Sequence, residues 1–158
     1  MITVDHETFR RLRELSGYSI KKVASVLKID ANDLQEYENG NKEMKFTMPA
    51  LRKLARLYKR SVDTFFLPAD VFEDISKFMI YEVKDDEESH EPIASSINLD
   101  EDSPELRHCL LKFREARYYQ HLLDLPDEVA EKAVVVKYKG KVYLVTYFGN
   151  SRRRQGHD

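Results

Sequence analysis

The side chains best suited to metal binding or nucleophilic catalysis are few in this chain and widely separated. Five histidines and one cysteine occur, at His6, His90, His108, Cys109, His121 and His157. None of the histidines lies at metal-ligand spacing from another or from the cysteine, and the adjacent His108 and Cys109 point to different sides of a helix. The serines and threonines form no recognisable nucleophile–base pattern, and the glycines form no phosphate-cradling loop. The sequence therefore predicts a protein that is not an enzyme and has no metal or cofactor.

Composition predicts a soluble, helix-rich protein. The chain has 158 residues, of which 42% are hydrophobic and 34% charged. No apolar run approaches the ~20 residues that span a bilayer, and the N-terminus lacks the apolar segment of a signal peptide. Cys109 has no second cysteine to pair with, so we expect it to be a small buried hydrophobe. These features predict a cytoplasmic protein with no membrane partner.

Charge is segregated along the chain, although the net charge is only −2. Residues 1–67 hold 13 Lys or Arg against 9 Asp or Glu, a net charge of +4. Residues 68–131 hold 6 against 18, or −12, and residues 132–158 hold 7 against 1, or +6. The basic N-terminal region suits binding to phosphates. The acidic middle is compatible either with a self-shielding segment or with an ordinary solubilising linker.

The stretch from Ser19 to Gly40 predicts two short helices joined by a tight turn. Ser19 is a favourable N-cap, and apolar residues follow it at helical spacing until Lys28. The pattern restarts after Asp30, a second N-cap residue, and it ends at Asn39-Gly40, which is typical of a helix C-terminus. Two helices joined by about three or four residues form a helix-turn-helix.

The same stretch resembles the lambda-repressor-like (Xre/Cro) helix-turn-helix family, whose members often read S-Q-x-x-L-A-x-x-L-G-V-S-x-x-x-I-S-x-W-E-N-G. The positions that fall on this frame are Ser19, Ala24, Leu27, Ile29, Asp30, Leu34, Tyr37, Glu38, Asn39 and Gly40. The resemblance extends over roughly residues 5–67, where FRRLRELSG matches the first helix and TMPALRKLARLYKRSVDTFFLP the fourth and fifth. It implies a mainly α fold, with a five-helix DNA-binding domain over residues 1–68.

Local signals in this region agree with that expectation. The expected N-caps are Thr3 or Asp5 for the first helix, Thr47 for the fourth and Ser61 for the fifth. In the first helix the apolar residues line one face, and the outer face is expected to carry Arg10, Arg11 and Arg13.

The resemblance implies that the second helix of the pair enters the major groove of double-stranded DNA. The residues that this places against base edges are Ala31, Asn32, Gln35 and Glu36. Those expected to contact phosphates, or to extend the same basic rim, are Ser19, Lys21, Lys22, Asn39, Asn41, Lys42 and Lys45. Ile20 departs from the family, which commonly has a phosphate-clamping glutamine there, and the second helix holds Asp33 and Glu36 but no Lys or Arg. We therefore expect modest affinity without dimerisation.

Beyond Pro68 the sequence predicts a connector and a small α+β segment. Residues 69–102 are expected to connect the parts, and the acidic residues 84–102 are expected to form a flexible linker or a loosely attached loop. Residues 103–158 are expected to hold a helix starting at Ser103-Pro104 and a β-hairpin turning at Lys139-Gly140. An isolated hairpin is only marginally stable, so it must pack on the helix or on another copy.

This second half resembles the leading part of ImmA/IrrE-type repressor–metallopeptidase fusions, in which an SPELR-like helix follows a Xre-like domain. The zinc peptidase of that family would show H-E-x-x-H, but here His90-Glu91 is followed by Pro92 with no second histidine in place. The chain therefore resembles the regulatory half without the catalytic half.

The sequence as a whole predicts a sequence-specific, repressor-like transcriptional regulator that binds DNA as a homodimer, with the C-terminal segment as the dimer surface or a sensing segment. The alternative is a protein–protein interaction module that docks or regulates a separately encoded partner, such as a metallopeptidase, with weak or no specific DNA binding. Salt dependence separates the two, because phosphate binding fades steeply as salt rises.

Overall fold

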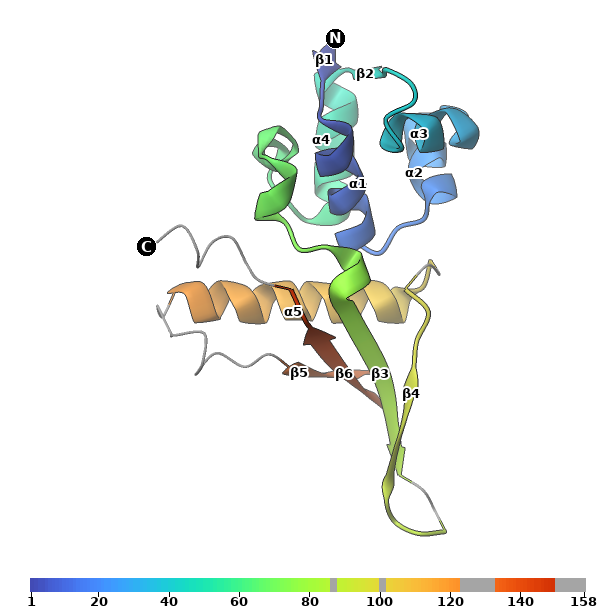
Figure 1. Cartoon of the computed structure of the whole chain (residues 1–158), viewed down its shortest axis with the longest axis vertical. Coiled ribbons are helices and arrows are strands. Elements are labelled where there is room, and N and C mark those ends of the chain that lie inside the picture. The colour runs from blue at the N-terminus through green and yellow to red at the C-terminus, as the bar shows by residue number, and fades with distance from the viewer. Residues whose placement is uncertain (86–87, 100–101, 123–132, 150–158) are drawn as a thin grey trace. The chain divides into compact units, whose positions relative to one another are not determined.

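The computed structural model of the chain describes residues 1–85, 88–99, 102–122 and 133–149. These residues fall into two compact units (Figure 1). The first unit spans Met1–Glu73, and the second contains the described residues from Asp74 onward. A helical N-terminal domain followed by an α+β part is therefore confirmed.

The first unit is a small helical bundle that closes with 3-10 turns. Its α-helices are α1 (His6–Leu15), α2 (Ile20–Leu27), α3 (Ala31–Glu38) and α4 (Met48–Tyr58). They are followed by the 3-10 helices η1 (Val62–Phe66) and η2 (Ala69–Val71), while β1 (Ile2–Thr3) pairs with β2 (Lys45–Phe46). The described part of this unit thus holds four α-helices and two short 3-10 helices, so the predicted count of five helices is not confirmed.

Side-chain caps determine where these helices begin. The carboxylate of Asp5, rather than Thr3, accepts a hydrogen bond from the backbone N–H of Thr8 at the start of α1. Ser19, Asp30, Thr47 and Ser61 cap α2, α3, α4 and η1 in the same way. Each cap satisfies backbone donors that a helix N-terminus leaves unpaired, so the predicted capping residues are in place.

The core of the first unit is built from aromatic rings and leucines. Phe9 is fully buried, and its ring stacks on Phe46 with centroids 5.0 Å apart and meets the edge of Tyr37 at 5.4 Å. Leu12, Leu34, Leu51 and Leu54 are also fully buried. Each such side chain contributes roughly 1.5–3 kcal/mol through removal from water, so α1, α3 and α4 depend on one shared core.

The described part of the second unit is a four-stranded antiparallel sheet with one α-helix on it. Its elements are η3 (Ile75–Lys77), β3 (Phe78–Asp85), β4 (Pro92–Ser96), α5 (Pro104–Leu122), β5 (Ala133–Tyr138) and β6 (Lys141–Tyr147). The strand order is β4-β3-β6-β5, so the predicted hairpin β5–β6 forms half of the sheet. The turn between these two strands has Lys139 and Gly140 at positive φ, as the type of turn expected there requires.

Strands β3 and β4 correct part of the interpretation of residues 84–102 as a flexible linker, because residues 84–85 and 92–96 lie in strands. Lys84 pairs with Ile93, and Asp85 pairs with Pro92, in the antiparallel register of β3 and β4. Every side chain of β4 is exposed, which explains why its composition resembles a linker. Backbone hydrogen bonds at the sheet edge, rather than burial, hold this strand in place.

Helix α5 packs its apolar stripe on one face of the sheet. Leu106, Cys109, Leu110 and Phe113 are buried, and the ring of Phe113 meets Phe78 of β3 edge-on at 4.9 Å between centroids. Burial of Cys109 agrees with its prediction as a small hydrophobe. The side chain of Leu122, the last residue of this helix, lies outside the described part, as do residues 123–132 and 150–158. None of the helices in the described ranges is long and apolar enough to cross a membrane.

The buried thiol of Cys109 gives a test of this packing. Burial on the apolar side of α5, with a smaller effect of the nearby Glu105 carboxylate, raises the pKa of Cys109 to about 12. The folded protein should therefore hold the thiol protonated at pH 9, where about half of an exposed cysteine is thiolate. We expect iodoacetamide to modify Cys109 at least ~100-fold more slowly in the native chain than in 8 M urea. Equal rates in the two conditions, measured by mass spectrometry, would contradict this packing.

Candidate nucleic-acid interface

Helices α2 and α3 form the helix-turn-helix predicted from the sequence. Lys28 ends α2 in the left-handed conformation, with φ of 59°, and the next N–H, that of Ile29, donates to the carbonyl of Ala24 at 3.0 Å. Asp30 then caps α3 by accepting hydrogen bonds from two backbone N–H groups of its first turn. Val23 and Ala24 on α2 are buried, as is Leu34 on α3, so the two helices pack closely at the turn.

The outer face of α3 carries the residues predicted to read bases. Asn32, Gln35 and Glu36 are exposed, and Ala31 at the start of the helix is half-buried. Their spacing puts them on one side of a two-turn helix, together with exposed Asn39 at its end. The structure thus brings these candidates together on one face, and their contact with bases stays a prediction.

Apart from Asn39, which ends α3, the predicted phosphate contacts fall into two groups. Ser19 caps α2 through its side-chain oxygen, and Lys21 and Lys22 lie exposed in the first turn of that helix. The second group consists of Asn41, Lys42 and Lys45, which line a hollow of about 470 Å³ between the N-terminal residues and the segment after α3. Asp5 and Glu43 line the same hollow, so its charge is mixed and favours no particular ligand.

Lys42 already has a partner within the domain. Its Nζ lies 2.8 Å from a carboxylate oxygen of Asp33, in an exposed ion pair between α3 and the loop that follows. This pair offsets the charge of Asp33, one of the two acids of α3 that are not buried. Because exposed pairs are weak, Lys42 can exchange Asp33 for a phosphate at a cost of less than about 1 kcal/mol.

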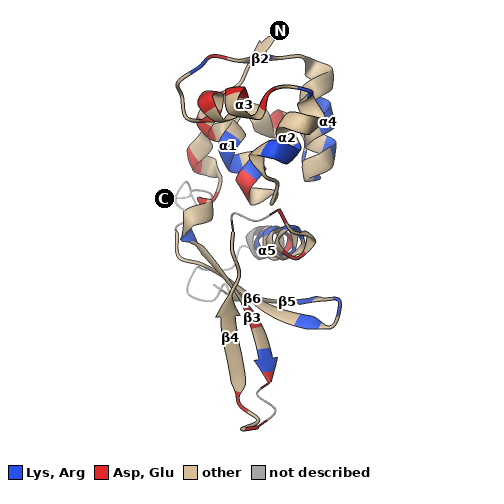
Figure 2. Ribbon diagram, turned by 90° about the vertical axis from the view of Figure 1, so that its right-hand side faces the viewer, with Lys and Arg blue, Asp and Glu red and all other residues tan. Residues whose placement is uncertain are grey.

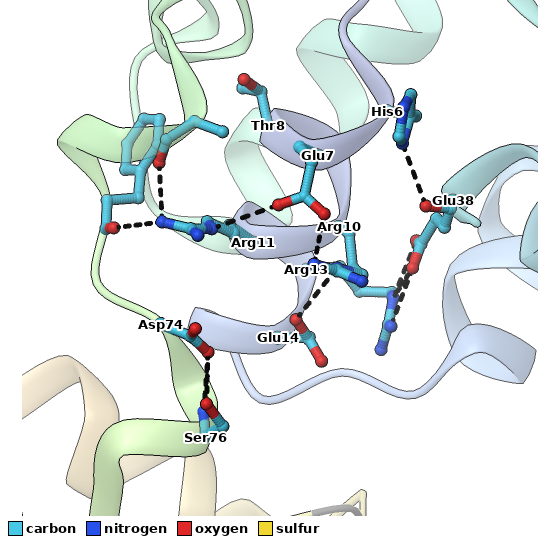
Figure 3. Close-up of polar contacts among 12 residues, drawn as sticks. His6, Glu7, Thr8, Arg10, Arg11, Arg13, Glu14, Glu38, Asp74 and Ser76 are labelled. Carbon is cyan, nitrogen blue, oxygen red and sulfur yellow. Dashed lines mark hydrogen bonds and ion pairs between the residues drawn. The ribbon is translucent and has the colours of Figure 1, made fainter. Parts of the chain in front are cut away.

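A buried ion pair fixes the far side of α3. The guanidinium of Arg13 on α1 donates from Nε and Nη2 to both carboxylate oxygens of Glu38, at 2.9–3.1 Å (Figure 3). The two side chains are only 12% and 2% exposed. Burial alone would lower the pKa of Arg13, but its hydrogen bond to Glu38 and the charge of that carboxylate raise the pKa above its usual value.

This pair corrects the prediction that all three arginines of α1 lie on an outer face. Arg13 points to Glu38 and also donates to the carbonyl of Tyr18 at 2.8 Å. Arg11 donates to the carbonyls of Ala69 and Phe72, so it ties η2 to α1. Arg10 pairs with Glu7, one turn earlier on the same helix. Arg11 and Arg13 thus link α1 to other parts of the domain, whereas Arg10 pairs within α1.

Two further contacts anchor the C-terminal end of α3. The hydroxyl of Tyr37 donates to the carbonyl of Val4 at 2.6 Å, and Nδ1 of His6 lies 3.2 Å from the carbonyl of Glu38. Gly40 follows with φ of +81°, and a Cβ there would approach the His6 ring to 3.1 Å. The N-terminal residues and α1 therefore hold the end of α3, which leaves its outer face free.

Helix α4 carries cations that the sequence interpretation missed. Arg52, Lys53 and Arg56 are exposed, the helix contains no acid, and within the described ranges these three form no ion pair. Figure 2 shows basic segments on both α2 and α4, whereas α3 is marked by acids. The signal was present in the sequence, since MPALRKLARLY holds three cations and no Asp or Glu.

The buried pair predicts a large effect on stability. We expect Glu38→Ala to lower the free energy of unfolding of the first unit by about 3–5 kcal/mol, because it leaves the Arg13 charge buried without a partner. The matched control is Asp33→Ala, which removes an exposed pair on the same helix and should cost less than about 1 kcal/mol. Urea denaturation followed by circular dichroism measures both. Similar losses for the two variants would contradict the role of the buried pair.

Comparison with known proteins supports the assignment of the first unit. Residues 7–65 match the family model described as Helix-turn-helix domain. No curated protein and no solved structure matches the chain. The match covers α1 through most of η1 and so contains both helices of the motif and the Arg13–Glu38 pair. Residues 7–65 of this chain are thus similar to a helix-turn-helix domain, a kind of domain that suggests DNA binding.

Proposed function

We propose that this chain is a sequence-specific, repressor-like transcriptional regulator that reads the major groove of DNA through α3. In this proposal it acts in the cytoplasm as a homodimer and belongs to the Xre/Cro group of helix-turn-helix proteins. The observation that carries the proposal is the exposed polar face of α3, with Asn32, Gln35 and Glu36, on a domain that matches the helix-turn-helix family. A recognition helix needs such a face, held by a fixed scaffold.

Each side chain on this face has a suitable base partner. The amide of Asn32 can donate to and accept from adenine in a bidentate contact, and Gln35 can do the same one turn later. Glu36 can accept a hydrogen bond from the amino group of cytosine, while the methyl of Ala31 can contact the methyl of thymine. Each good contact is worth about 1–3 kcal/mol of discrimination between bases.

Phosphate contacts must come mainly from outside α3. That helix and its cap carry three exposed or half-exposed acids, Asp30, Asp33 and Glu36, which oppose a phosphate backbone. Lys21 and Lys22 on α2 and the cations of α4 can supply the attraction, and Lys42 offsets Asp33. The balance supports modest affinity for one domain. Two domains on paired half-sites ~34 Å apart would multiply it.

A second candidate function is a protein-docking module, which the large exposed hydrophobic residues of the second unit favour. Met79, Val135 and Phe148 are among them. In this version the chain binds or regulates a separately encoded partner such as a metallopeptidase, as the resemblance to ImmA/IrrE-type fusions implies. Among the described residues, no group of three or more metal-ligating side chains lies close enough to hold a metal ion.

The contribution of Asn32 tests base readout. Duplexes enriched by binding the full chain to a random-sequence pool supply the site, and fluorescence anisotropy measures its affinity against a scrambled duplex. We expect Asn32→Ala to lower the preference for one position of the site by about 1–3 kcal/mol, because it removes a bidentate contact. The control is Asn98→Ala, an exposed asparagine in the second unit. An unchanged base preference in Asn32→Ala would rule out readout by this residue, and a pool without enrichment would overturn specific binding.

The cations of α4 give an independent prediction. We expect the double variant Arg52→Ala, Arg56→Ala to weaken binding to the selected and the scrambled duplex alike. The slope of log K against log salt should become shallower by about 2, because each arginine removed takes away one phosphate interaction and roughly one unit of slope. Lys77→Ala, an exposed cation in the second unit, serves as the control and should leave the slope unchanged. A double variant with the wild-type slope would place the phosphate interactions elsewhere.

A further inference from the structure

The two faces of the sheet in the second unit differ in what covers them. Phe78 and Ile80 on β3, with Tyr143 and Val145 on β6, are buried and point toward α5. Side chains alternate along a strand, so the intervening residues point to the opposite face. Figure 2 looks nearly along α5, with the strands beneath it. Within the described ranges, no helix of this unit lies on the opposite face, which we call the open face.

The open face is nearly as apolar as the covered one. In register across the sheet it comprises Met79, Tyr81, Val83 and Asp85 on β3, Ala94 and Ser96 on β4, Ala133, Val135 and Lys137 on β5, and Val142, Leu144 and Thr146 on β6. Met79 is 42% exposed and Val135 is 64% exposed. An antiparallel sheet whose outer face meets water normally alternates apolar and polar residues. This face lacks that alternation, which is typical of a surface that binds a partner.

The charges on the open face are arranged so that the face complements itself. Lys137 lies on edge strand β5 and aligns across the sheet with Val83 of β3. Asp85 lies two residues after Val83, at the end of β3, which is the neighbour of edge strand β4. Neither forms an ion pair with another described residue. A two-fold axis parallel to the strands would set β5 of one copy over β4 of a second copy. Lys137 of each copy would then lie toward Asp85 of the other.

From this arrangement we propose that the open face binds the open face of a second copy of this chain. Four strands about 4.8 Å apart and six residues of about 3.3 Å rise give a footprint of roughly 400 Å² per copy. That is about half the area per partner of a standard stable interface, so the dimer belongs to the class of weak, reversible interfaces. This deepens the proposed function by naming the dimer surface, and two faces packed in this way form a sandwich of known type.

Sedimentation equilibrium of the full chain without DNA tests the proposal over 1–100 μM. We expect a monomer–dimer equilibrium, and we expect Val135→Lys to raise the dissociation constant at least ~30-fold. Val135 is exposed on an edge strand, so this variant should fold, as circular dichroism would show. The matched control is Ile93→Lys, since Ile93 is 51% exposed on edge strand β4 but belongs to the opposite side of the sheet. A chain that stays monomeric at 100 μM would overturn the proposal, as would a dimer that both variants weaken equally.

A charge swap tests the orientation of the two copies. Lys137→Asp and Asp85→Lys should each weaken the dimer about tenfold, because each places like charges opposite one another twice. An equimolar mixture of the two variants should restore association, since every contact between positions 137 and 85 then joins opposite charges. Failure of the mixture to associate would overturn this arrangement. Because these measurements contain no DNA, their failure is distinguishable from failure of DNA binding.

Discussion

The buried ion pair between Arg13 and Glu38 is the constraint on which the helix-turn-helix domain depends. Two charges taken out of water are stable only with near-complete hydrogen bonding, and the guanidinium meets both oxygens of the carboxylate. Its geometry is planar and bidentate, so it fixes the rotation of α3 about its own axis as well as its position. Apolar packing of Leu34 alone would tolerate small rotations of this short helix. The intact pair therefore fixes orientation and adds little net stability, whereas removal of one partner is costly because it leaves the other charge buried and unpaired.

Because of that constraint, the residues of α3 that stabilise the fold lie on a different face from its exposed polar residues. Its inner face holds Leu34, Tyr37 and Glu38, all buried and committed to α1 and the N-terminal residues. Its outer face holds polar residues whose replacement leaves the core untouched. A domain built in this way can exchange the residues of its outer face without losing its fold. In the proposed function, base specificity would come from α3 and phosphate attraction from the cations of α2 and α4, so different elements would supply the two.

Sequence patterns predicted the elements of the first unit better than its internal contacts. Caps such as Asp30 and Thr47 are local signals, since each bonds to backbone groups within three residues. The structure confirms both predicted caps. Arg13 was misplaced because an arginine beside two others on a helix resembles a solvated face, and its partner Glu38 lies 25 positions away. The available signal was Glu38 itself, which follows Leu34 by four residues and therefore lies on the apolar side of α3. Strand β4 was missed because edge pairing leaves all its side chains exposed.

The second unit shows why a hairpin predicted to be marginal does not remain alone. The addition of β3 and β4 gives four strands, and α5 covers one face with the rings of Phe78, Phe113 and Tyr147 in mutual contact. One helix can bury only one face of a sheet, so the valines and Leu144 on the other face gain little from folding the monomer. The remaining exposed apolar area of these side chains lowers the free energy only when a second surface removes it from water. The proposed pairing of two open faces would remove these side chains from water and give the sheet the second apolar layer that α5 alone does not provide.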